Sequence, residues 1–540
     1  MNTIVFHPES DPNAVRDAAA ILRRGGLLGI PTETVYGLGA DALNEDAVSR
    51  IFLAKGRPQD NPLIIHVPDA SWLERYCRSV PPAAYQLAER FWPGPLTMIL
   101  PRRDIVPLQT TGGLETVGVR CPNHPVTLAI IEAAGVPIAA PSGNTSGRPS
   151  PTTAAHMIED MDGRIDGIVD GGPCTVGVES TIIDLTVTPP RLLRPGGLPL
   201  ESLRQVLGEV AVDKAVTGLL AAGERPRAPG MKYRHYAPHA PVTVVTGEPE
   251  RSARRIQGLL SDTAGVICFD EYAPLFPGHI IHKLGPAADK SAQARHVFDA
   301  LRTFDGTDVT EIFAQCPDDG GLGLAVANRL KKAAGFHLID ADHPLIVGLT
   351  GGTGAGKTSA LAALEDLGGT VLDCDAVYHQ MLRTDPALRE AITAAFGPVF
   401  CPDGSLDRQK LGTLVFSDHA ALDRLNAIVY EYLPPELMRR AAGQSLVGLD
   451  AINLVESGLD RLCACTVAVL APAEDRVRRI MARDGISEDY ARLRISAQQP
   501  DVFYRERCSH ILENNCATLA QFREQARIFF RSMLREIEHL

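Results

Sequence analysis

One segment of the chain has the spacing of a phosphate-binding loop. Residues 351–358 read GGTGAGKT and fit the pattern G-x-x-x-x-G-K-[ST]. Successive backbone N–H groups in such a turn point inward around phosphate oxygens, and larger side chains would block the approach. Lys357 would reach the outer phosphates of ATP, and the Thr358 hydroxyl would hold Mg²⁺. We therefore predict an ATP site made of Gly351, Gly352, Thr353, Gly354, Ala355, Gly356, Lys357 and Thr358.

Charged residues that could serve this site follow in two places. Residues 370–375, TVLDCD, are expected to form a strand that brings Asp373 and Asp375 to its carboxyl end, where ligands bind in parallel sheets. A carboxylate there would orient an acceptor hydroxyl or coordinate Mg²⁺, and the alternative for each aspartate is to cap the next helix. Arg479 and Arg483 lie one helical turn apart. That spacing suits a lid over phosphates or a plain solvated face.

The first half of the chain has polar residues that suit a triphosphate without such a loop. Lys55 and Arg57 are separated by one residue, so on an extended segment both would point the same way. The pair alone is a weak signal, but a turn rich in hydroxyl and amide groups (141–152) and two strands with polar ends (178–185 and 192–197) accompany it. Nothing here has the pattern of a covalent nucleophile. The chemistry indicated is positioning and charge neutralisation of a reacting phosphate.

These residues need a scaffold, and the hydrophobic pattern predicts an α/β one. Asp11-Pro12 and Gly25-Gly26 bracket a helix over 11–26, and residues 27–31 read as a buried strand. Residues 222–241 are rich in Pro, Gly, Arg, His and Tyr without a hydrophobic period, which is typical of a linker. The division expected is a first domain over 1–208, a linker over 209–241, a small α/β domain over 242–340 and a last domain over 344–540.

Bulk properties narrow the class of protein. With 540 residues the chain is too long for one core, and its net charge of −12 argues against a surface that grips DNA or RNA throughout. The eleven scattered cysteines are expected to be reduced thiols. The sequence starts without a signal-peptide pattern, and no apolar run reaches membrane-spanning length. We therefore expect a cytoplasmic enzyme with no membrane contact and no stable DNA binding.

The last domain resembles the dephospho-coenzyme A kinase family over its whole length. The matching stretches are VGLTGGTGAGKT, VLDCDAV, FGPVFCPDGSLDRQKLGTLVF, VESGLDRL, RVRRIMARDGISEDYARLRISAQ and ILENN. The resemblance implies transfer of the γ-phosphoryl group of ATP to the ribose 3′-hydroxyl of dephospho-coenzyme A. It also implies an acid–base role for Asp375, acceptor binding by Asp407 and Arg408, and ATP binding by the lid residues Arg479 and Arg483.

The chain departs from that family at two places. Tyr430-Glu431 stand where the family usually has His-Pro, and residues 452–456 read Ile-Asn-Leu-Val-Glu where it has Pro-Leu-Leu-Phe-Glu. Both places lie toward the acceptor side. A kinase for another small hydroxyl acceptor, or an inactive kinase domain, therefore stays open beside the main interpretation.

The first two domains resemble the threonylcarbamoyl-AMP synthase family. The motifs PTETVYGLG, K-x-R, PGPLT, VGVRCP, APSGNTSG, ESTIID and LRPGG occur in the order found in its YrdC-like catalytic domain. PGMKYRHYAPHAP and GLGLAVANRLKKAAGF resemble the linker and accessory domain of its longer form. The resemblance implies that L-threonine, bicarbonate and ATP form threonylcarbamoyl-adenylate and pyrophosphate. A downstream tRNA-modifying transferase complex would then use this product for N6 modification of adenosine 37.

The same resemblance implies two sets of binding residues. Those facing ATP would be Lys55, Arg57, Asn61, Thr116, Ser142, Asn144, Ser150, Arg194 and Tyr236. Those facing threonine would be Thr34, His66, Arg120, Ala140 and Ser180, with Tyr36 in the same cleft. Arg120 can pair with a carboxylate or bicarbonate, a neutral His66 can exchange hydrogen bonds with the amino acid, and Mg²⁺ with Lys55 and Arg57 would neutralise the phosphates.

The linker of the longer form supports one further prediction. Residues Lys232, Tyr233, Arg234, His235 and Tyr236 are expected to form a lid over the first site, and the alternative is a plain tether. The whole chain is thus interpreted as a fusion of two enzymes. The fold expected is a YrdC-like twisted mixed sheet with helices, a small α/β accessory domain, and a P-loop kinase domain with a parallel sheet and a helical lid. A tRNA-binding module remains an alternative of another class.

Overall fold

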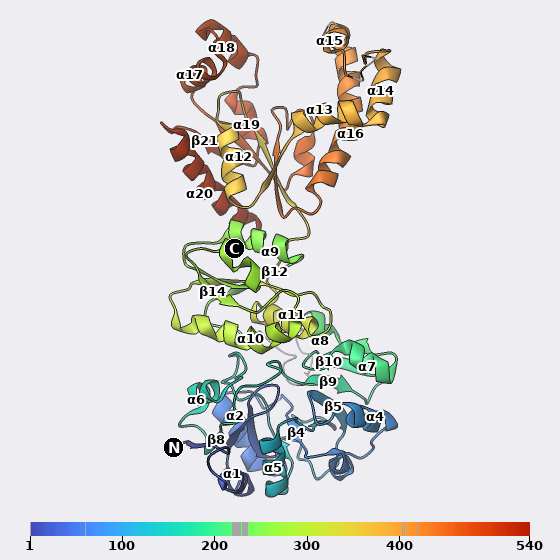
Figure 1. Cartoon of the computed structure of the whole chain (residues 1–540), viewed down its shortest axis with the longest axis vertical. Coiled ribbons are helices and arrows are strands. Elements are labelled where there is room, and N and C mark those ends of the chain that lie inside the picture. The colour runs from blue at the N-terminus through green and yellow to red at the C-terminus, as the bar shows by residue number, and fades with distance from the viewer. Residues whose placement is uncertain are drawn as a thin grey trace. The chain divides into compact units, whose positions relative to one another are not determined.

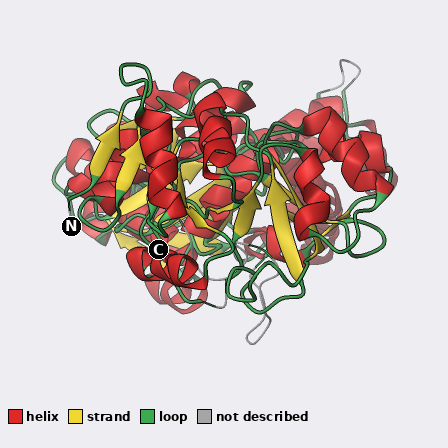
Figure 2. Ribbon diagram, turned by 90° about the horizontal axis from the view of Figure 1, so that it is seen from below, coloured by secondary structure: helices red, strands yellow, loops and turns green. Residues whose placement is uncertain are grey.

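The computed structural model describes residues 2–59, 61–218, 228, 236–401, 403, 405–416 and 418–539. The chain divides into two compact units (Figure 1). Unit 1 comprises Met1–Pro249 and Ser261–Ile339, and unit 2 comprises Glu250–Leu260 and Asp340–Leu540. Both units are built from strands with helices packed against them (Figure 2). The predicted α/β class is confirmed, whereas the finer division into four segments stays a prediction.

The first part of unit 1 is a mixed, eleven-stranded sheet. Parallel and antiparallel neighbours alternate irregularly along it, as expected for the YrdC-like fold. In spatial order its strands are β1 (Ile4–Phe6), β8 (Gly167–Val169), β2 (Leu28–Ile30), β3 (Gly37–Asp41), β7 (Ile138–Ala139), β4 (Ile64–His66), β6 (Thr116–Arg120), β5 (Leu96–Pro101), β9 (Thr181–Asp184), β10 (Arg191–Arg194) and β11 (Ala211–Val212). Its helices are α1 (Ala14–Arg23), α2 (Glu45–Lys55), α3 (Leu73–Tyr76), α4 (Pro82–Phe91), α5 (Pro125–Ala134), α6 (Ala154–Met161), α7 (Leu200–Leu207) and α8 (Lys214–Thr217).

The first helix is shorter than its sequence signals suggest. It was expected over 11–26, but α1 begins only at Ala14. The Asp11 carboxylate accepts a hydrogen bond of 2.9 Å from the backbone N–H of Asn13, so it closes a turn ahead of the helix instead of capping it. At the other end Gly25 has a φ of 78°, which ends the helix where the glycine pair predicts.

The second part of unit 1 is a five-stranded sheet with two long helices. Its strands, in spatial order, are β14 (Ile280–Lys283), β13 (Ala264–Cys268), β15 (Glu311–Gln315), β12 (Val242–Thr246) and β16 (Leu338–Asp340). Its helices are α10 (Lys290–Thr303) and α11 (Gly323–Ala333). We call the first part of unit 1 the catalytic part, after the family domain that it resembles, and the second part the accessory domain. A shared hydrophobic core joins the two, since Val35 and Val178 cluster with residues of α10 and α11.

Unit 2 is a parallel five-stranded sheet, as predicted. Its strands, in spatial order, are β18 (Thr370–Asp373), β19 (Leu446–Asp450), β17 (Leu345–Thr350), β20 (Cys465–Leu470) and β21 (His510–Glu513). Its helices are α9 (Pro249–Leu259), α12 (Lys357–Asp366), α13 (Cys374–Thr384), α14 (Pro386–Phe396), α15 (Arg408–Phe416), α16 (His419–Ala441), α17 (Ala473–Asp484), α18 (Glu488–Ser496), α19 (Asp501–Arg507) and α20 (Leu519–Ile537). Within the described ranges, no helix has the length and apolarity that crossing a membrane requires.

Helix α9 belongs to unit 2 although it lies between β12 and β13 in the sequence. Its buried Arg255 donates a hydrogen bond of 2.9 Å to the carbonyl oxygen of Ser445 and forms an ion pair with Glu538, just after α20. Gly258 has no side chain, so the backbone of Leu367 can approach α9 closely. A segment from the middle of the chain thus completes the packing of the last domain.

Candidate active sites

The predicted phosphate loop lies between β17 and α12. Gly351, Gly354 and Gly356 have positive φ angles of 128°, 81° and 113°. A Cβ atom on Gly351 would lie 2.3 Å from the carbonyl oxygen of Val469 in β20. All three positions therefore favour glycine for their backbone conformation, and Gly351 also for the close approach of the neighbouring strand.

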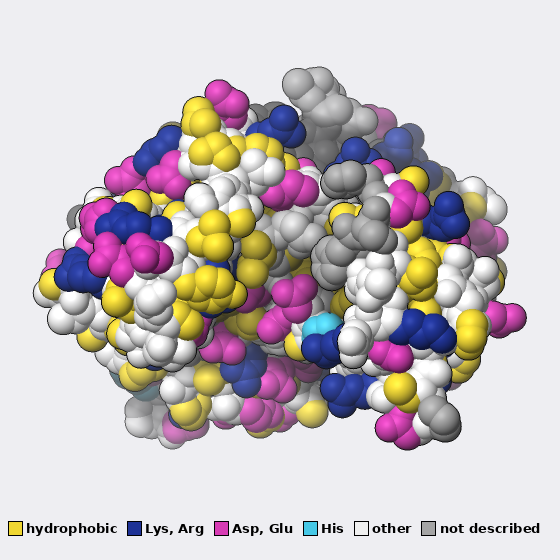
Figure 3. All heavy atoms as spheres, turned by 90° about the horizontal axis from the view of Figure 1, so that it is seen from above, with side chains coloured by type: hydrophobic (Ala, Val, Ile, Leu, Met, Phe, Trp, Pro, Cys, Tyr) yellow, Lys and Arg dark blue, Asp and Glu magenta, His cyan; other side chains and the backbone are white. Residues whose placement is uncertain are grey.

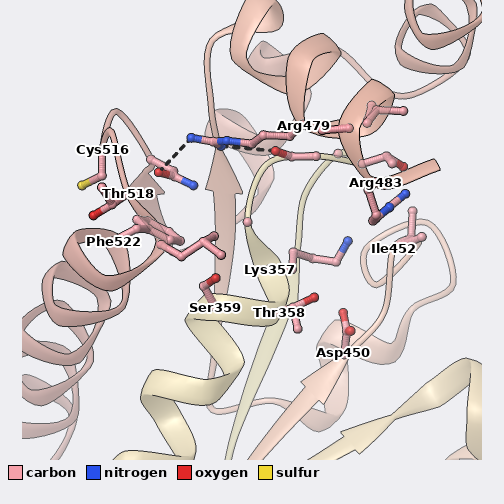
Figure 4. Close-up of a pocket in the computed structure, with 18 of the residues that line it drawn as sticks. Lys357, Thr358, Ser359, Asp450, Ile452, Arg479, Arg483, Cys516, Thr518 and Phe522 are labelled. Carbon is pink, nitrogen blue, oxygen red and sulfur yellow. Dashed lines mark hydrogen bonds between the residues drawn. The ribbon is translucent and has the colours of Figure 1, made fainter. Parts of the chain in front are cut away.

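Lys357 and Asp450 lie on the same side of the cavity above this loop (Figure 4). The Lys357 ammonium donates a hydrogen bond of 3.1 Å to the carbonyl oxygen of Gly351. Burial lowers the pKa of Lys357, and the negative charges of Asp450 and Asp375 oppose that shift. Burial likewise raises the pKa of Asp450, and Lys357 opposes it. The two groups are thus electrostatically coupled.

Asp450 was missed in the sequence. The signal was present, because Asp450 ends the buried strand β19 as Asp373 ends β18. Its Oδ1 atom is buried and has no hydrogen-bond partner among the described residues. Buried carboxylate oxygens normally have a partner, so this atom has spare capacity for a cation or a hydroxyl group.

The residues beside Asp450 fit Mg²⁺ by their chemistry. Mg²⁺ prefers oxygen ligands, usually one or two protein groups together with phosphate oxygens and water. The Thr358 hydroxyl and the unpaired oxygen of Asp450 line the same cavity. These two side chains would hold the ion that the sequence predicts at Thr358.

Arg479 and Arg483 come from α17 and line the wall opposite Lys357 (Figure 4). Arg479 donates hydrogen bonds of 3.2 Å to the carbonyl oxygen of Gly354 and 3.3 Å to Asn514 Oδ1. Arg483 is 59% exposed and pairs with Asp484 at 2.7 Å. The structure therefore brings both predicted lid arginines to the phosphate loop, one fixed against it and one at the solvent edge.

Three further polar residues fix the backbone of the loop. Gln498 accepts a hydrogen bond of 2.9 Å from the backbone N–H of Thr353, and Arg476 donates one of 3.0 Å to the carbonyl oxygen of Thr353. Asn514 donates one of 2.8 Å to the carbonyl oxygen of Ala355. Sequence reasoning did not single out these side chains, because only the tertiary fold brings them to the loop.

The loop opens into a cavity of about 740 Å³. This is within the size range of small-molecule and cofactor sites. Figure 3 looks onto the end of unit 2 that is uppermost in Figure 1, and the surface there is hollowed between two raised parts. The other lining residues include Ser359, Ile452, Arg494, Cys516, Thr518 and Phe522. The cavity has a cationic wall and an apolar wall, which suits a nucleotide.

The predicted acceptor residues are distributed differently. The prediction that Asp375 ends strand β18 is wrong: Asp375 is exposed in the first turn of α13. The helix begins earlier than predicted because Asp373 caps it, accepting a hydrogen bond of 2.9 Å from the backbone N–H of Ala376. Asp375 still faces Lys357 electrostatically. Asp407 accepts a hydrogen bond of 2.9 Å from the N–H of Lys410 at the start of α15, and Arg408 next to it is exposed. Neither is among the residues that line the cavity described here.

In unit 1 the extended geometry expected for Lys55 and Arg57 is wrong. Lys55 is the last residue of α2, and Gly56 ends the helix with a φ of 63° and donates to the carbonyl oxygen of Leu53. The Lys55 ammonium is buried and donates to the carbonyl oxygens of Ser142 and Asn144. Burial lowers its pKa well below the ordinary value, with the charge of Arg57 adding to the shift. The position of Lys55 at the end of a helix depends on the C-cap Gly56, which was not recognised as a helix end in the sequence.

Strand register brings predicted threonine-facing residues together. His66 at the end of β4 pairs with Arg120 at the end of β6. Burial, with help from the charge of Arg120, lowers the pKa of His66 to about 3, so His66 is neutral at neutral pH. Arg120 lies 2.7 Å from a carboxylate oxygen of Glu33, with both side chains 5% exposed. The N–H of Ala140 donates to the carbonyl oxygen of Ile64 on β4.

Neighbouring hydroxyl groups line up around β9. The Ser180 hydroxyl is 2.8 Å from that of Thr97 and accepts a bond of 3.2 Å from Arg194. The Ser150 hydroxyl donates at 2.8 Å to Glu179, the residue just before Ser180. Predicted ATP-facing and threonine-facing residues therefore meet at 179–180.

The remaining predicted residues of this unit are placed as follows. Asn144 holds its own turn by donating to the carbonyl oxygens of Thr145 and Arg148, and Ser142 donates to Asn144 at 2.6 Å. The other positions are Thr34, whose buried hydroxyl is 2.8 Å from that of Thr32; Tyr36, which donates to the carbonyl oxygen of Gly172 at 2.7 Å; Asn61, with a buried side-chain oxygen; and Thr116, at the start of β6.

Of the predicted lid, only Tyr236 belongs to the described residues. Lys232, Tyr233, Arg234 and His235 lie outside them. Tyr236 is buried with a φ of 65°, and its ring packs against Phe298 with 5.1 Å between ring centroids. The lid hypothesis for the other four residues stays a prediction.

Three family models match the chain. One is described as telomere recombination and matches residues 20–196, and one is the C-terminal domain of threonylcarbamoyl-AMP synthase, at residues 198–335. The third is dephospho-CoA kinase, at residues 345–520. The resemblances inferred from the motifs are confirmed.

Individual proteins give the same result. The threonylcarbamoyl-AMP synthase of Pyrococcus abyssi is 50% identical over 331 residues, which is 60% of this chain and 95% of that protein. The crystal structure of P. abyssi Sua5 complexed with L-threonine has a TM-score of 0.59 at 48% identity, covering 63% of this chain and 99% of that one. The dephospho-CoA kinase of Moorella thermoacetica is 38% identical over 175 residues, 31% of this chain and 82% of that protein.

The chain therefore belongs to the threonylcarbamoyl-AMP synthase family over the catalytic and accessory parts of unit 1, and to the dephospho-CoA kinase family over the P-loop part of unit 2.

Proposed function

We propose that unit 1 joins L-threonine, bicarbonate and ATP into threonylcarbamoyl-adenylate and releases pyrophosphate. The observation that carries this is the buried Lys55, held by two carbonyl oxygens beside the hydroxyl-rich turn at 142–150. The negative charge of bound phosphates would oppose the effect of burial on the pKa of Lys55 and favour its charged form, and a cation kept out of water acts strongly on phosphate oxygens. The product would pass to a tRNA-modifying transferase complex.

The residues of this site suggest a division of roles. The amino group of threonine would condense with bicarbonate, with loss of water, to give a carbamate whose oxygen attacks the α-phosphorus of ATP and expels pyrophosphate. Arg120 would bind the threonine carboxylate and neutral His66 would exchange a hydrogen bond with the amino acid. Lys55, Arg57 and Arg194 would bind the phosphates, and Asn61, Thr116, Ser142, Asn144 and Ser150 would complete the ATP site.

We propose that unit 2 transfers the γ-phosphoryl group of ATP to the 3′-hydroxyl of dephospho-coenzyme A. The carrying observation is the phosphate loop, where Lys357 and Asp450 line one cavity and the charge of Asp375 also acts on Lys357. Mg²⁺, held by Thr358 and Asp450, would neutralise charge on the phosphates. Asp375 would accept the proton of the acceptor hydroxyl, Arg479 and Arg483 would bind the transferred group, and Asp407 with Arg408 would hold the acceptor.

A second acceptor is a separate candidate for unit 2. Tyr430 and Asn453, two residues at which the chain departs from the kinase family, are hydrogen-bonded to each other at 3.2 Å. A changed pair of polar groups on the acceptor side favours a different small hydroxyl compound. Phosphorylation of that compound, with none of dephospho-coenzyme A, would support this candidate.

The test measures ATP turnover with each substrate set supplied separately. Threonine with bicarbonate should release pyrophosphate, and Lys55→Ala should abolish this while leaving the kinase reaction intact. Dephospho-coenzyme A should yield ADP and coenzyme A, and Lys357→Ala should abolish only that. Each variant is thus the matched control of the other. Loss of both reactions in either variant, or no turnover by the unmodified chain, would contradict the assignment.

A further inference from the structure

One face of α11 carries polar side chains that are almost completely buried. Asn328, Arg329 and Lys332 are 3%, 0% and 5% exposed. Charged residues are rarely buried to this degree without partners, since leaving water is costly. The motif ANRLKK from which they come is part of the accessory domain, and the catalytic roles proposed above do not use it. Their partners show what this face does.

Arg329 is paired with Glu179, which lies two residues before β9 in the catalytic part. Arg329 Nε lies 2.7 Å from Glu179 Oε2, and the two side chains are 0% and 7% exposed. Arg329 also donates a hydrogen bond of 2.9 Å to Asn328 Oδ1, and the Asn328 side chain donates one of 2.8 Å to the carbonyl oxygen of Val216. The guanidinium is therefore held from its own helix and aimed at a single carboxylate.

Glu179 links this arginine to the proposed ATP site. Its other carboxylate oxygen accepts the hydrogen bond from Ser150, and Arg194 acts on it electrostatically. Burial raises the pKa of Glu179, but Arg329 and Arg194 more than offset this and lower the pKa to about 2. Glu179 is thus a fixed anion between one arginine of the accessory domain and two residues proposed to face ATP.

Tyr236 is the second link. The Arg329 guanidinium carbon lies 5.6 Å from the centroid of the Tyr236 ring, and Phe298 of α10 packs against the same ring. A tyrosine with a φ of 65° needs surrounding contacts to hold that conformation. The accessory domain supplies two of those contacts.

We propose that Arg329 is a positioning residue for ATP in the synthase reaction. It acts through Glu179 on Ser150 and Arg194, and by direct stacking on Tyr236. The accessory domain is accordingly a structural part of the synthase active site. This inference rests on the proposed function of unit 1, and specifically on ATP binding at Ser150, Arg194 and Tyr236.

The test compares the chain with and without Arg329→Met, both carrying Lys357→Ala so that ATP binding is measured in unit 1. We expect the KM for ATP and the Kd of a non-hydrolysable ATP analogue to rise about ten-fold, the size of one lost charge-assisted contact. The KM for threonine should change less than about two-fold on the same reasoning. Arg329→Lys should recover only part of the ATP affinity, because lysine keeps the charge but loses the planar fork.

A double variant separates positioning from simple stability. Arg329→Met leaves Glu179 buried without its main partner, so it should lower the melting temperature. Adding Glu179→Gln removes that unpaired charge and should restore the melting temperature, but not the affinity for ATP. Recovery of ATP affinity together with stability would overturn the proposal.

A comparable ion pair serves as the matched control. Arg302 of α10 is 4% exposed and pairs with the fully buried Asp160 of α6. The variant Arg302→Met with Asp160→Asn should affect stability more than the KM for ATP. If the KM for ATP rose as much as in Arg329→Met, loss of any buried ion pair in unit 1 would weaken ATP binding. That result would overturn a specific role for Arg329. If the chain made no threonylcarbamoyl-adenylate but bound the ATP analogue Arg329-dependently, the proposed function would fail and only the role of Arg329 in ATP binding would stand. If threonylcarbamoyl-adenylate formed and Arg329→Met left the KM for ATP unchanged, only this inference would fail.

Discussion

The side-chain amide of Asn453 donates a hydrogen bond of 3.2 Å to the phenol oxygen of Tyr430. Tyr430 belongs to α16, and Asn453 follows β19 just after Asp450. The two places where the chain departs from the kinase family are thus one contact in space. Burial raises the pKa of Tyr430, so its hydroxyl stays protonated at neutral pH and can act as donor and acceptor.

This contact gives a prediction about the acceptor. We expect Tyr430→Phe to raise the KM for the acceptor a few-fold, about the effect of one neutral hydrogen bond, without changing ATP affinity. Asn453→Leu should act similarly, and the double variant should be no worse than either single one, because both remove the same contact. Acceptor KM values and ATP binding check this. Additive effects would show that the two residues act independently.

Asp450 and Asp375 are expected to be essential to the kinase, and Asp373 is not. Asp450→Asn and Asp375→Asn should each lower kcat about 100-fold or more, since each removes a charge placed beside Lys357. Asp373→Asn is the matched control, because asparagine also caps a helix well. Steady-state kinetics with dephospho-coenzyme A measures all three. A large loss in Asp373→Asn alone would reverse the assignment.

The buried His66 predicts a pH dependence of stability. Its pKa is about 3 in the folded chain and 6.5 in an ordinary setting, so the unfolded chain binds the proton between these values. Its contribution to stability is complete above pH 6.5 and declines as the pH falls toward 3, by about 1.4 kcal/mol per pH unit. His66→Gln should remove this component. Denaturant unfolding at several pH values measures it, and identical slopes in both chains would contradict the prediction.

A substitution in α9 should destabilise unit 2, although this helix lies between two strands of unit 1 in the sequence. Arg255→Met should destabilise unit 2 by about 3 kcal/mol, because it leaves Glu538 and the carbonyl oxygen of Ser445 without a buried donor. Thermal unfolding with and without dephospho-coenzyme A, which should bind and stabilise unit 2 alone, locates the affected transition. The exposed Arg254, which pairs with Glu250 in its own helix, provides the control Arg254→Met. Equal losses in both variants would contradict the contact.

The sequence by itself determined the α/β class, the phosphate loop and both families. Glycine spacing, strand punctuation and motif order are local, and they located the phosphate loop at 351–358, directly after β17. Helical spacing also puts Arg479 and Arg483 on one face, but only the family resemblance assigned them to the ATP site of Lys357.

Only the tertiary structure decided the contacts made across the chain. Asp450 faces Lys357 because β19 lies beside β17, and Arg329 reaches Glu179 because α11 packs on the catalytic part. The geometry of Lys55 depends on the glycine that ends its helix. Burial lowers the pKa of Lys55 and His66, and two arginines distant in sequence keep Glu179 charged against the effect of burial; both are properties of the packed chain that no short stretch of sequence carries.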